Sequence, residues 1–180
     1  MSLINRIKTA CWNSMVKKFT SRENRNRSTF NLDNAKTVGI VYNASEEYMI
    51  KETDDLIDYL KYRGIKTKSI GLAHYNIVPH YCIPQLSKLF ICQKDLNWCW
   101  KPSRQKTEDF LNEDFDLLIS LDLEQDKTLQ YLAAASNAKF KAGYYHPDNI
   151  PVFDFLVKSD INQLKDYIKQ LIYYLSVFNT

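Results

Sequence analysis

The sequence predicts an α/β protein, a three-layer sandwich with a mostly parallel, Rossmann-like sheet of five to six strands and a basic N-terminal helical arm. Short, continuous apolar runs such as 37–42 (TVGIVY) and 116–122 (DLLISLD) are typical of strands buried on both faces. The segments between them carry apolar residues at helical spacing. Strands that alternate with helices favour a parallel sheet with helices on its faces.

Length and composition indicate one domain behind the arm. The 180 residues are 45% apolar, enough for a core without disulfides or metals. We place the boundary near Phe30, with a basic arm over 1–30 and a single α/β domain over 31–180. The four cysteines form no CxxC pair, and no apolar run approaches the roughly 20 residues that span a bilayer. A soluble protein with free thiols in the reducing cytoplasm is therefore expected.

The arm combines a charge excess with an apolar stripe. Leu3, Ile7, Cys11 and Phe19 belong to that stripe on an expected helix. The basic residues, which we take as candidate nucleic-acid contacts, are Arg6, Lys8, Lys17, Lys18, Arg22, Arg25 and Arg27. The helix is expected to dock on the body, to lie on an anionic membrane surface, or to neutralise RNA phosphates, and docking is compatible with RNA contact.

The first β-α-β unit follows the arm. After the strand at 37–42, Asn43 and Glu46 match a helix-capping pattern, and Arg63 with Gly64 matches a helix end. The second strand is expected at 67–73. The unit implies two parallel strands with a right-handed connection.

The rest of the chain repeats this alternation. Two prolines make 74–88 an irregular crossover. The remaining strands are expected at 89–93, 116–122, 140–145 and 152–157, the helices at about 103–112 and 127–138, and a closing helix from Ser159 or Asp160 that carries Ile161, Leu164 and Leu171 on one face.

The first strand ends at a candidate ligand crevice. In open α/β sheets ligands bind at the carboxyl ends of the strands, where the strand order reverses. Asn43, Ser45 and Asp122 are expected at such ends, although capping and turn formation explain the same residues. The turn lacks GxGxxG and GxxxxGK[ST], and its acidic helix start disfavours phosphate.

Chemistry beyond binding has little support. Asp122 lies near Asp116, Glu124 and Asp126, but no second catalytic group accompanies these carboxylates. His74, His80 and Cys82 match no standard zinc spacing, and a Cys-His catalytic pair among them lacks an identifiable nucleophile. We expect no metal, no cofactor and no catalytic residue.

The loop KDLNWCWKPS, 94–103, contains two candidate ligand-binding tryptophans. Trp98 and Trp100 follow the third strand and would stack on a base, a sugar or a partner side chain if exposed. The alternative is a hydrophobic plug at the sheet edge.

Three motifs carry a resemblance to a known family. KDLNWCWKPS, FLNEDFDLLISLDL and LQYLAAASNAKFKAGYY resemble an uncharacterised family of Bacteroidota proteins, the domain of unknown function numbered 6913. The resemblance covers the chain from about Thr37 onward and implies a fold rather than an activity. Trp100 stands where the family pattern has a glycine before Lys101 and Pro102.

A fainter resemblance concerns the run from 115 to 145, which is similar to the N-terminal, acceptor-side half of heptosyltransferases. Those enzymes need a second domain, and 180 residues are too few for one, so glycosyl transfer is not expected. We expect a non-catalytic, cytoplasmic binding protein whose arm contacts RNA or a ribonucleoprotein particle. The alternatives are a small-ligand binder for a sugar or nucleotide, or a degenerate glycosyltransferase-like protein, using Asn43, Trp98 and Asp122, and a peripheral membrane protein.

Overall fold

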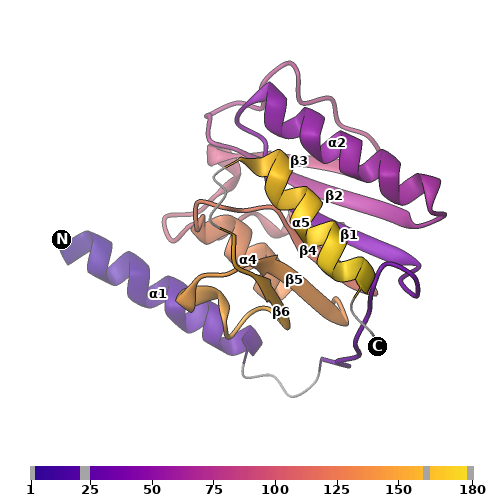
Figure 1. The fold of residues 1–180 in the computed structure, drawn as a ribbon. Helices are drawn as coiled ribbons and strands as arrows, with labels where there is room; N and C mark the ends of the chain where they lie inside the picture. Colours follow the sequence, from indigo (N-terminus) through magenta and orange to yellow (C-terminus); the bar gives the residue numbers. More distant parts are fainter. Residues whose placement is uncertain (1–2, 21–24, 160–162, 178–180) are drawn as a thin grey trace.

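The computed structural model describes residues 3–20, 25–159 and 163–177 and contains a six-stranded parallel sheet between two layers of helices (Figure 1). The strand order is β3-β2-β1-β4-β5-β6. The strands are β1 (Thr37–Asn43), β2 (Lys66–Ala73), β3 (Lys88–Cys92), β4 (Leu117–Ser120), β5 (Phe140–Tyr144) and β6 (Phe155–Val157). The α/β sandwich expected from the sequence is confirmed, and the strand order reverses between β1 and β4.

The helices cover both faces of the sheet. They are α1 (Leu3–Thr20), α2 (Glu47–Tyr62), α3 (Arg104–Leu111), α4 (Lys127–Ala135) and α5 (Leu164–Val177), with the short 3-10 helices η1 (Gln93–Asp95) and η2 (Pro147–Asn149). Alternate strand residues face opposite sides. Ile40 packs in one core with α2 and α5, whereas Val41 packs in a second core with α3 and α4.

Two local expectations change. Helix α2 begins at Glu47, and the Glu46 side chain makes no capping hydrogen bond, so the expected capping box is wrong. Asn43 Oδ1 instead accepts a hydrogen bond from the Ser45 N–H at 2.9 Å, which ends β1 in a tight turn. Strand β6 begins at Phe155 rather than at Val152, because the Val152 and Phe153 N–H groups donate to the Asn149 carbonyl oxygen in a turn that follows η2. The expected helical positions Asp160 and Ile161 lie outside the described residues.

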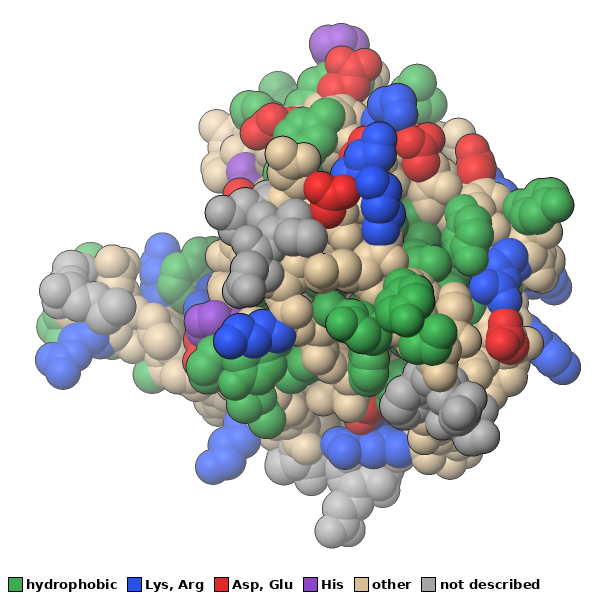
Figure 2. Space-filling model, viewed as in Figure 1, with side chains coloured by type: hydrophobic (Ala, Val, Ile, Leu, Met, Phe, Trp, Pro, Cys, Tyr) green, Lys and Arg blue, Asp and Glu red, His purple; other side chains and the backbone are tan. Residues whose placement is uncertain are grey.

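Helix α1 packs on the body against α4. Trp12 and Val16 are buried, and the Trp12 indole N–H donates to the Lys127 carbonyl oxygen at 2.8 Å. The first turns stand clear of the body at the left of Figure 2, where Leu3 and Ile4 are 73% and 66% exposed. The docked arrangement therefore holds for the second half of the helix. No helix in the described part of the chain is long and apolar enough to cross a membrane.

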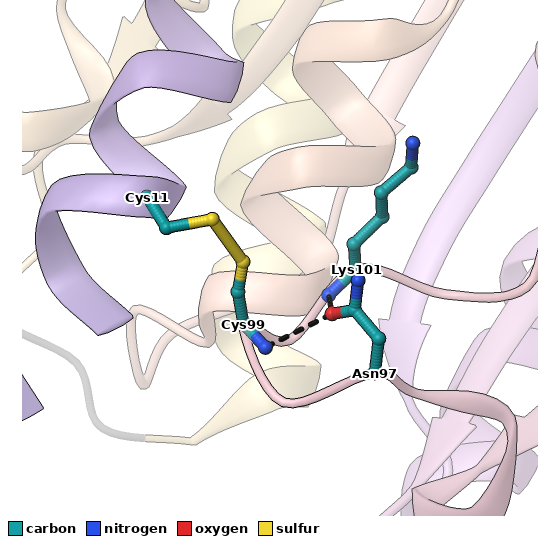
Figure 3. Close-up of a disulfide and its surroundings, with 4 residues drawn as sticks. All are labelled: Cys11, Asn97, Cys99 and Lys101. Carbon is teal, nitrogen blue, oxygen red and sulfur yellow. Dashed lines mark hydrogen bonds between the residues drawn. A yellow bond between two sulfur atoms is a disulfide. The ribbon is translucent and has the colours of Figure 1, made fainter. Parts of the chain in front are cut away.

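A disulfide also joins α1 to the body. Cys11 in α1 is bonded to Cys99 in the loop after η1, 88 residues further along the chain (Figure 3). The expectation of four free thiols is therefore wrong for this pair, whereas Cys82 and Cys92 are free and buried.

Candidate functional site

A crevice lies at the carboxyl ends of the strands, at the reversal between β1 and β4. It encloses about 260 Å³ and opens on the side of the sheet that carries α2 and α5. Its lining consists of Asn43, Tyr48, Met49, Leu121, Asp122, Leu123, Glu124, Tyr144 and Leu164. The structure therefore brings together Asn43 and Asp122, two of the residues proposed from the sequence, at the position where open α/β sheets bind ligands.

Hydrogen bonds hold the β1 side of the crevice. Asn43 uses its oxygen for the Ser45 turn, and its Nδ2 lies 3.4 Å from Glu124 Oε2 across the reversal. Ser45 does not line the crevice. Its hydroxyl accepts a hydrogen bond from the His74 N–H at 2.9 Å, and its carbonyl oxygen accepts one from the Tyr81 hydroxyl at 2.6 Å. Ser45 thus connects the loop after β1 to the segment after β2, next to the crevice residue Asn43.

Asp122 is the buried carboxyl group of the site. Its side-chain oxygens accept hydrogen bonds from the Glu124 N–H at 2.9 Å and the Asp126 N–H at 2.8 Å. Burial raises the pKa of Asp122 to about 7, and the neighbouring carboxylates of Asp126 and Glu124 also raise it, against the two backbone N–H groups. The group therefore changes its proton occupancy near neutral pH, so it can serve a ligand as a donor or as an acceptor.

The loop after β4 contains a feature that the sequence did not reveal. Gln125 has a φ of 63°, in the left-handed region that favours glycine. Its side-chain amide oxygen and nitrogen are buried without a hydrogen-bond partner among the described residues. Asp126, the next residue, caps α4 by accepting hydrogen bonds from the Thr128 and Leu129 N–H groups. Backbone strain and unpaired polar groups of this kind are concentrated at functional sites.

Aromatic residues form the far wall and the rim. The Tyr144 ring packs edge-on against Tyr167 at 5.8 Å between centroids, and its hydroxyl donates to the Ser159 carbonyl oxygen at 3.2 Å. Tyr48 is 51% exposed at the start of α2. Sequence analysis did not single out either tyrosine, because tyrosines are common in the chain and nothing local marks these two.

The two tryptophans lie outside the crevice. Trp100 packs against the second core, on the side of α3 and α4, and Trp98 is 57% exposed. Asn97 Oδ1 accepts hydrogen bonds from the Cys99 and Lys101 N–H groups, which tightens the turn (Figure 3). Trp100 has a φ of 59°, so this position requires the left-handed conformation that a glycine would adopt readily. The plug interpretation thus fits Trp100 but not Trp98.

The basic residues of the arm do not form one surface. Arg25 is paired with Asp154, and Arg27 Nη1 lies 3.9 Å from the same carboxylate oxygen. Lys8 Nζ lies 5.6 Å from the Trp100 ring centroid. Arg6, Lys17 and Lys18 are exposed, and Figure 2 shows basic side chains spaced along α1 with neutral and hydrophobic ones between them. Arg22 lies outside the described residues.

The other residues considered for metal binding or catalysis do not come together in a site among the described residues. No group of three His, Cys, Asp or Glu residues in 3–20, 25–159 and 163–177 could hold a metal ion. Burial raises the pKa of the Cys82 thiol to about 11, which makes it a poor nucleophile at neutral pH. Asp116 accepts hydrogen bonds from the Lys36 and Thr37 N–H groups and pairs with Lys139 at 2.8 Å, so its role is structural.

The strand order and the crevice define a Rossmann-like α/β protein with a candidate ligand site at the strand reversal. The chain belongs to a family of unknown function (DUF6913), whose model matches residues 8–178. The match includes residues 8–20 of α1 as well as the whole sheet. No curated protein matches the chain.

Proposed function

We propose that this protein binds a small ligand, without catalysis, in the crevice at the carboxyl ends of β1, β4 and β5. The observation that carries the proposal is the coincidence of a 260 Å³ cavity with the strand reversal and with the polar side chains Asn43, Asp122 and Glu124. Ligand sites in proteins are commonly concave and largely apolar, with a few placed polar groups. Leu121, Met49 and Leu164 supply the apolar surface here.

The lining favours a ligand that donates hydrogen bonds. Glu124 and the ionised form of Asp122 are acceptors, and the acidic start of α2 at Glu46 and Glu47 is close in sequence to the rim residue Tyr48. A phosphate would meet negative charge and no cation among the lining residues. The ligand class that fits is a sugar, a nucleoside or an amine, bound through its hydroxyl or amino groups.

Calorimetric titration with panels of monosaccharides, nucleosides and small amines tests this proposal. A ligand from these classes should bind with a single site, and Glu124→Gln should weaken it about tenfold, as expected for the loss of a charged acceptor. Glu124 is exposed, so the variant keeps the fold. Glu108→Gln, on α3 at the other face, is the matched control and should bind normally. Equal affinity in both variants, or no binding by any panel member, would refute the proposal.

A second candidate function is RNA contact by α1 in the cytoplasm, which the exposed Arg6, Lys17 and Lys18 favour. Because α1 is docked, deletion of the arm would expose α4, so charge substitution is the better test. RNA binding that falls with salt, and that Arg6→Gln with Lys18→Gln weakens, would support this function. Salt-independent binding, or binding that the double variant leaves unchanged, would oppose it.

The same helix also suits an anionic membrane surface, because Leu3, Ile4 and Ile7 are exposed beside Arg6. Co-sedimentation of the full chain with phosphatidylserine vesicles, compared with phosphatidylcholine vesicles, distinguishes this attachment from RNA contact. Loss of co-sedimentation in Ile4→Asn would support membrane attachment, and retention would oppose it.

A further inference from the structure

A second cavity lies at the opposite end of the sheet, where β5 begins. It encloses about 120 Å³ between the end of α1, the turn after α4 and the segment before β1. Its cationic residues are Arg25, Arg27 and Lys141, and its remaining polar lining consists of Thr20, Ser136 and Asn137. A water molecule needs only about 10 to 15 Å³. The cavity therefore has room for a small polyatomic ion, but not for a sugar together with a base.

Lys141 places a buried ammonium group against this cavity. The residue is 2% exposed, and its Nζ donates to the Ala134 carbonyl oxygen at 3.0 Å near the end of α4. An ammonium group has three N–H donors, so this bond leaves donors for a further acceptor. Burial lowers the pKa of Lys141 to about 7, and the positive charges of Arg25 and Arg27 lower it further, whereas Asp154 opposes this effect. An anion in the cavity would stabilise the charged form.

Arg25 is also incompletely satisfied. Its side chain is 13% exposed and pairs with Asp154 through Nη2, but its buried Nε has no hydrogen-bond partner in the described part of the chain. Arg27 Nη1 lies 3.9 Å from the same Asp154 oxygen. The second Asp154 oxygen accepts a hydrogen bond from the Lys141 backbone N–H at 2.9 Å. One carboxylate thus pairs with two guanidinium groups, and the Lys141 ammonium lines the same cavity without a direct contact to it, which leaves positive charge at a partly enclosed cavity.

We propose that this cavity is a binding site for a phosphate-class oxyanion, held by Arg25, Arg27 and the Lys141 ammonium group. Arginine N–H groups and an ammonium match the acceptor oxygens of such an ion, and charge-assisted hydrogen bonds of this kind are the strong ones. The site is separate from the crevice, since it lies at the amino end of β5 and carries the opposite charge. It does not depend on the proposed function of the crevice.

The test is a titration of the full chain with inorganic phosphate and with sulfate. Binding is measured by calorimetry and by the shift of the thermal unfolding midpoint, with sodium chloride added to keep the ionic strength constant. The wild type should bind one phosphate, and Lys141→Met and Arg27→Gln should each weaken binding about tenfold. Arg27 is 61% exposed, so Arg27→Gln keeps the test valid if the buried substitution impairs folding. Lys165→Gln, an exposed cation on α5, is the matched charge control and should bind as the wild type does.

Unchanged phosphate affinity in Arg27→Gln, equal weakening by Lys165→Gln, or no saturable binding by the wild type would overturn the site. A competition experiment distinguishes a free oxyanion from a phosphate group that belongs to a nucleic acid. The competitor is one short single-stranded RNA, tested with and without a 5′ phosphate. Displacement of phosphate by the phosphorylated form alone would identify a terminal phosphate group as the occupant. Displacement by neither form would identify a free oxyanion, and either result supports the site.

Discussion

The indole N–H of Trp12 donates a hydrogen bond to the main-chain oxygen of Lys127 at 2.8 Å, and the Lys127 ammonium lies 4.1 Å from the centroid of the same ring. Trp12 is 4% exposed. This contact joins the middle of α1 to the first residue of α4. The N-terminal helix is therefore docked on the folded body through the middle of its length, rather than attached as a loose tail.

Trp12→Ala should lower the free energy of unfolding by about 3 to 5 kcal/mol, because it removes a large buried ring. Trp12→Phe keeps much of the burial and should cost about 1 to 2 kcal/mol, through the unpaired Lys127 oxygen. Urea denaturation followed by circular dichroism measures both. Ile4→Ala, on the exposed first turn, should stay within about 0.5 kcal/mol of the wild type. Equal effects at positions 4 and 12 would contradict the docked helix.

The disulfide should also stabilise the docked helix. Closure of an 88-residue loop between Cys11 and Cys99 is worth about 3 to 5 kcal/mol by the chain-entropy argument. Dithiothreitol should therefore lower the unfolding midpoint of the oxidised wild type and leave Cys11→Ser with Cys99→Ser unchanged. The cytoplasmic location that we propose would keep this pair reduced, and thiol alkylation of native extracts reports which form is present. A reductant effect of the same size in the double variant would point to another cause.

Asp122 should make stability fall as the pH rises from about 4 to 7. The pKa of its carboxyl group is raised from 3.8 to about 7 in the folded protein, so in this interval the folded state holds a proton that the unfolded state has released. The slope approaches about 1.4 kcal/mol per pH unit. Urea unfolding at several pH values, with Asp122→Asn subtracted, isolates this contribution, which is fully present below pH 4. A flat difference from pH 5 to 7 would contradict the raised pKa.

Lys141 should make the free energy of unfolding rise with pH above about pH 7. Its pKa is lowered from 10.5 to about 7 by burial and by Arg25 and Arg27, against Asp154. Between those values the unfolded state holds the proton and the folded state does not, so stability should rise with pH from about 7 to 10. Lys141→Met should remove that rise when the same unfolding series is run at constant ionic strength. Phosphate should reduce the slope in the wild type alone, since it favours the charged ammonium, and an unaltered slope would contradict the link.

Gln125→Gly should stabilise the fold by about 1 kcal/mol. It relieves a left-handed conformation and removes a buried amide without partners among the described residues, and these gains exceed the added chain entropy. Gln105→Gly on α3 is the control and should destabilise by about 1 kcal/mol. Thermal unfolding compares the two. If Gln125→Gly is more stable but binds the crevice ligand less well, the strained loop serves binding. If it is less stable than the wild type, the Gln125 amide makes hydrogen bonds in solution, which would contradict the prediction.

Much of the fold was predictable because the central strands β1 and β4 contain continuous, buried apolar runs and because turn or capping residues follow the main elements. The left-handed Gly64 after Arg63, for example, ends α2 where the sequence indicated. The Asn43 turn was not predictable, because the Asn43 side chain can accept a hydrogen bond either from a helix N–H or from the Ser45 N–H, and the folded backbone decides which bond forms. The Cys11 and Cys99 pairing depends on helix docking across 88 residues, which no local pattern encodes.

The site was predictable in part for the same reason. Asn43 and Asp122 stand at strand ends, and the reversal of strand order brings those ends together. Tyr48 and Tyr144 come from elements whose lateral placement the sequence does not specify. Lys141 looks like an ordinary strand residue, and its burial follows only from the packing of α1 and α4 over β5.

The most direct test of the central claim is amide chemical-shift mapping of the isotope-labelled full chain during titration with the best binder from the sugar, nucleoside and amine panels. We predict saturable shifts that cluster at Asn43, Leu123, Glu124 and Tyr144 and that shrink in Glu124→Gln. Shifts that cluster instead at Trp98 or along α1, with the crevice amides unmoved, would contradict the account.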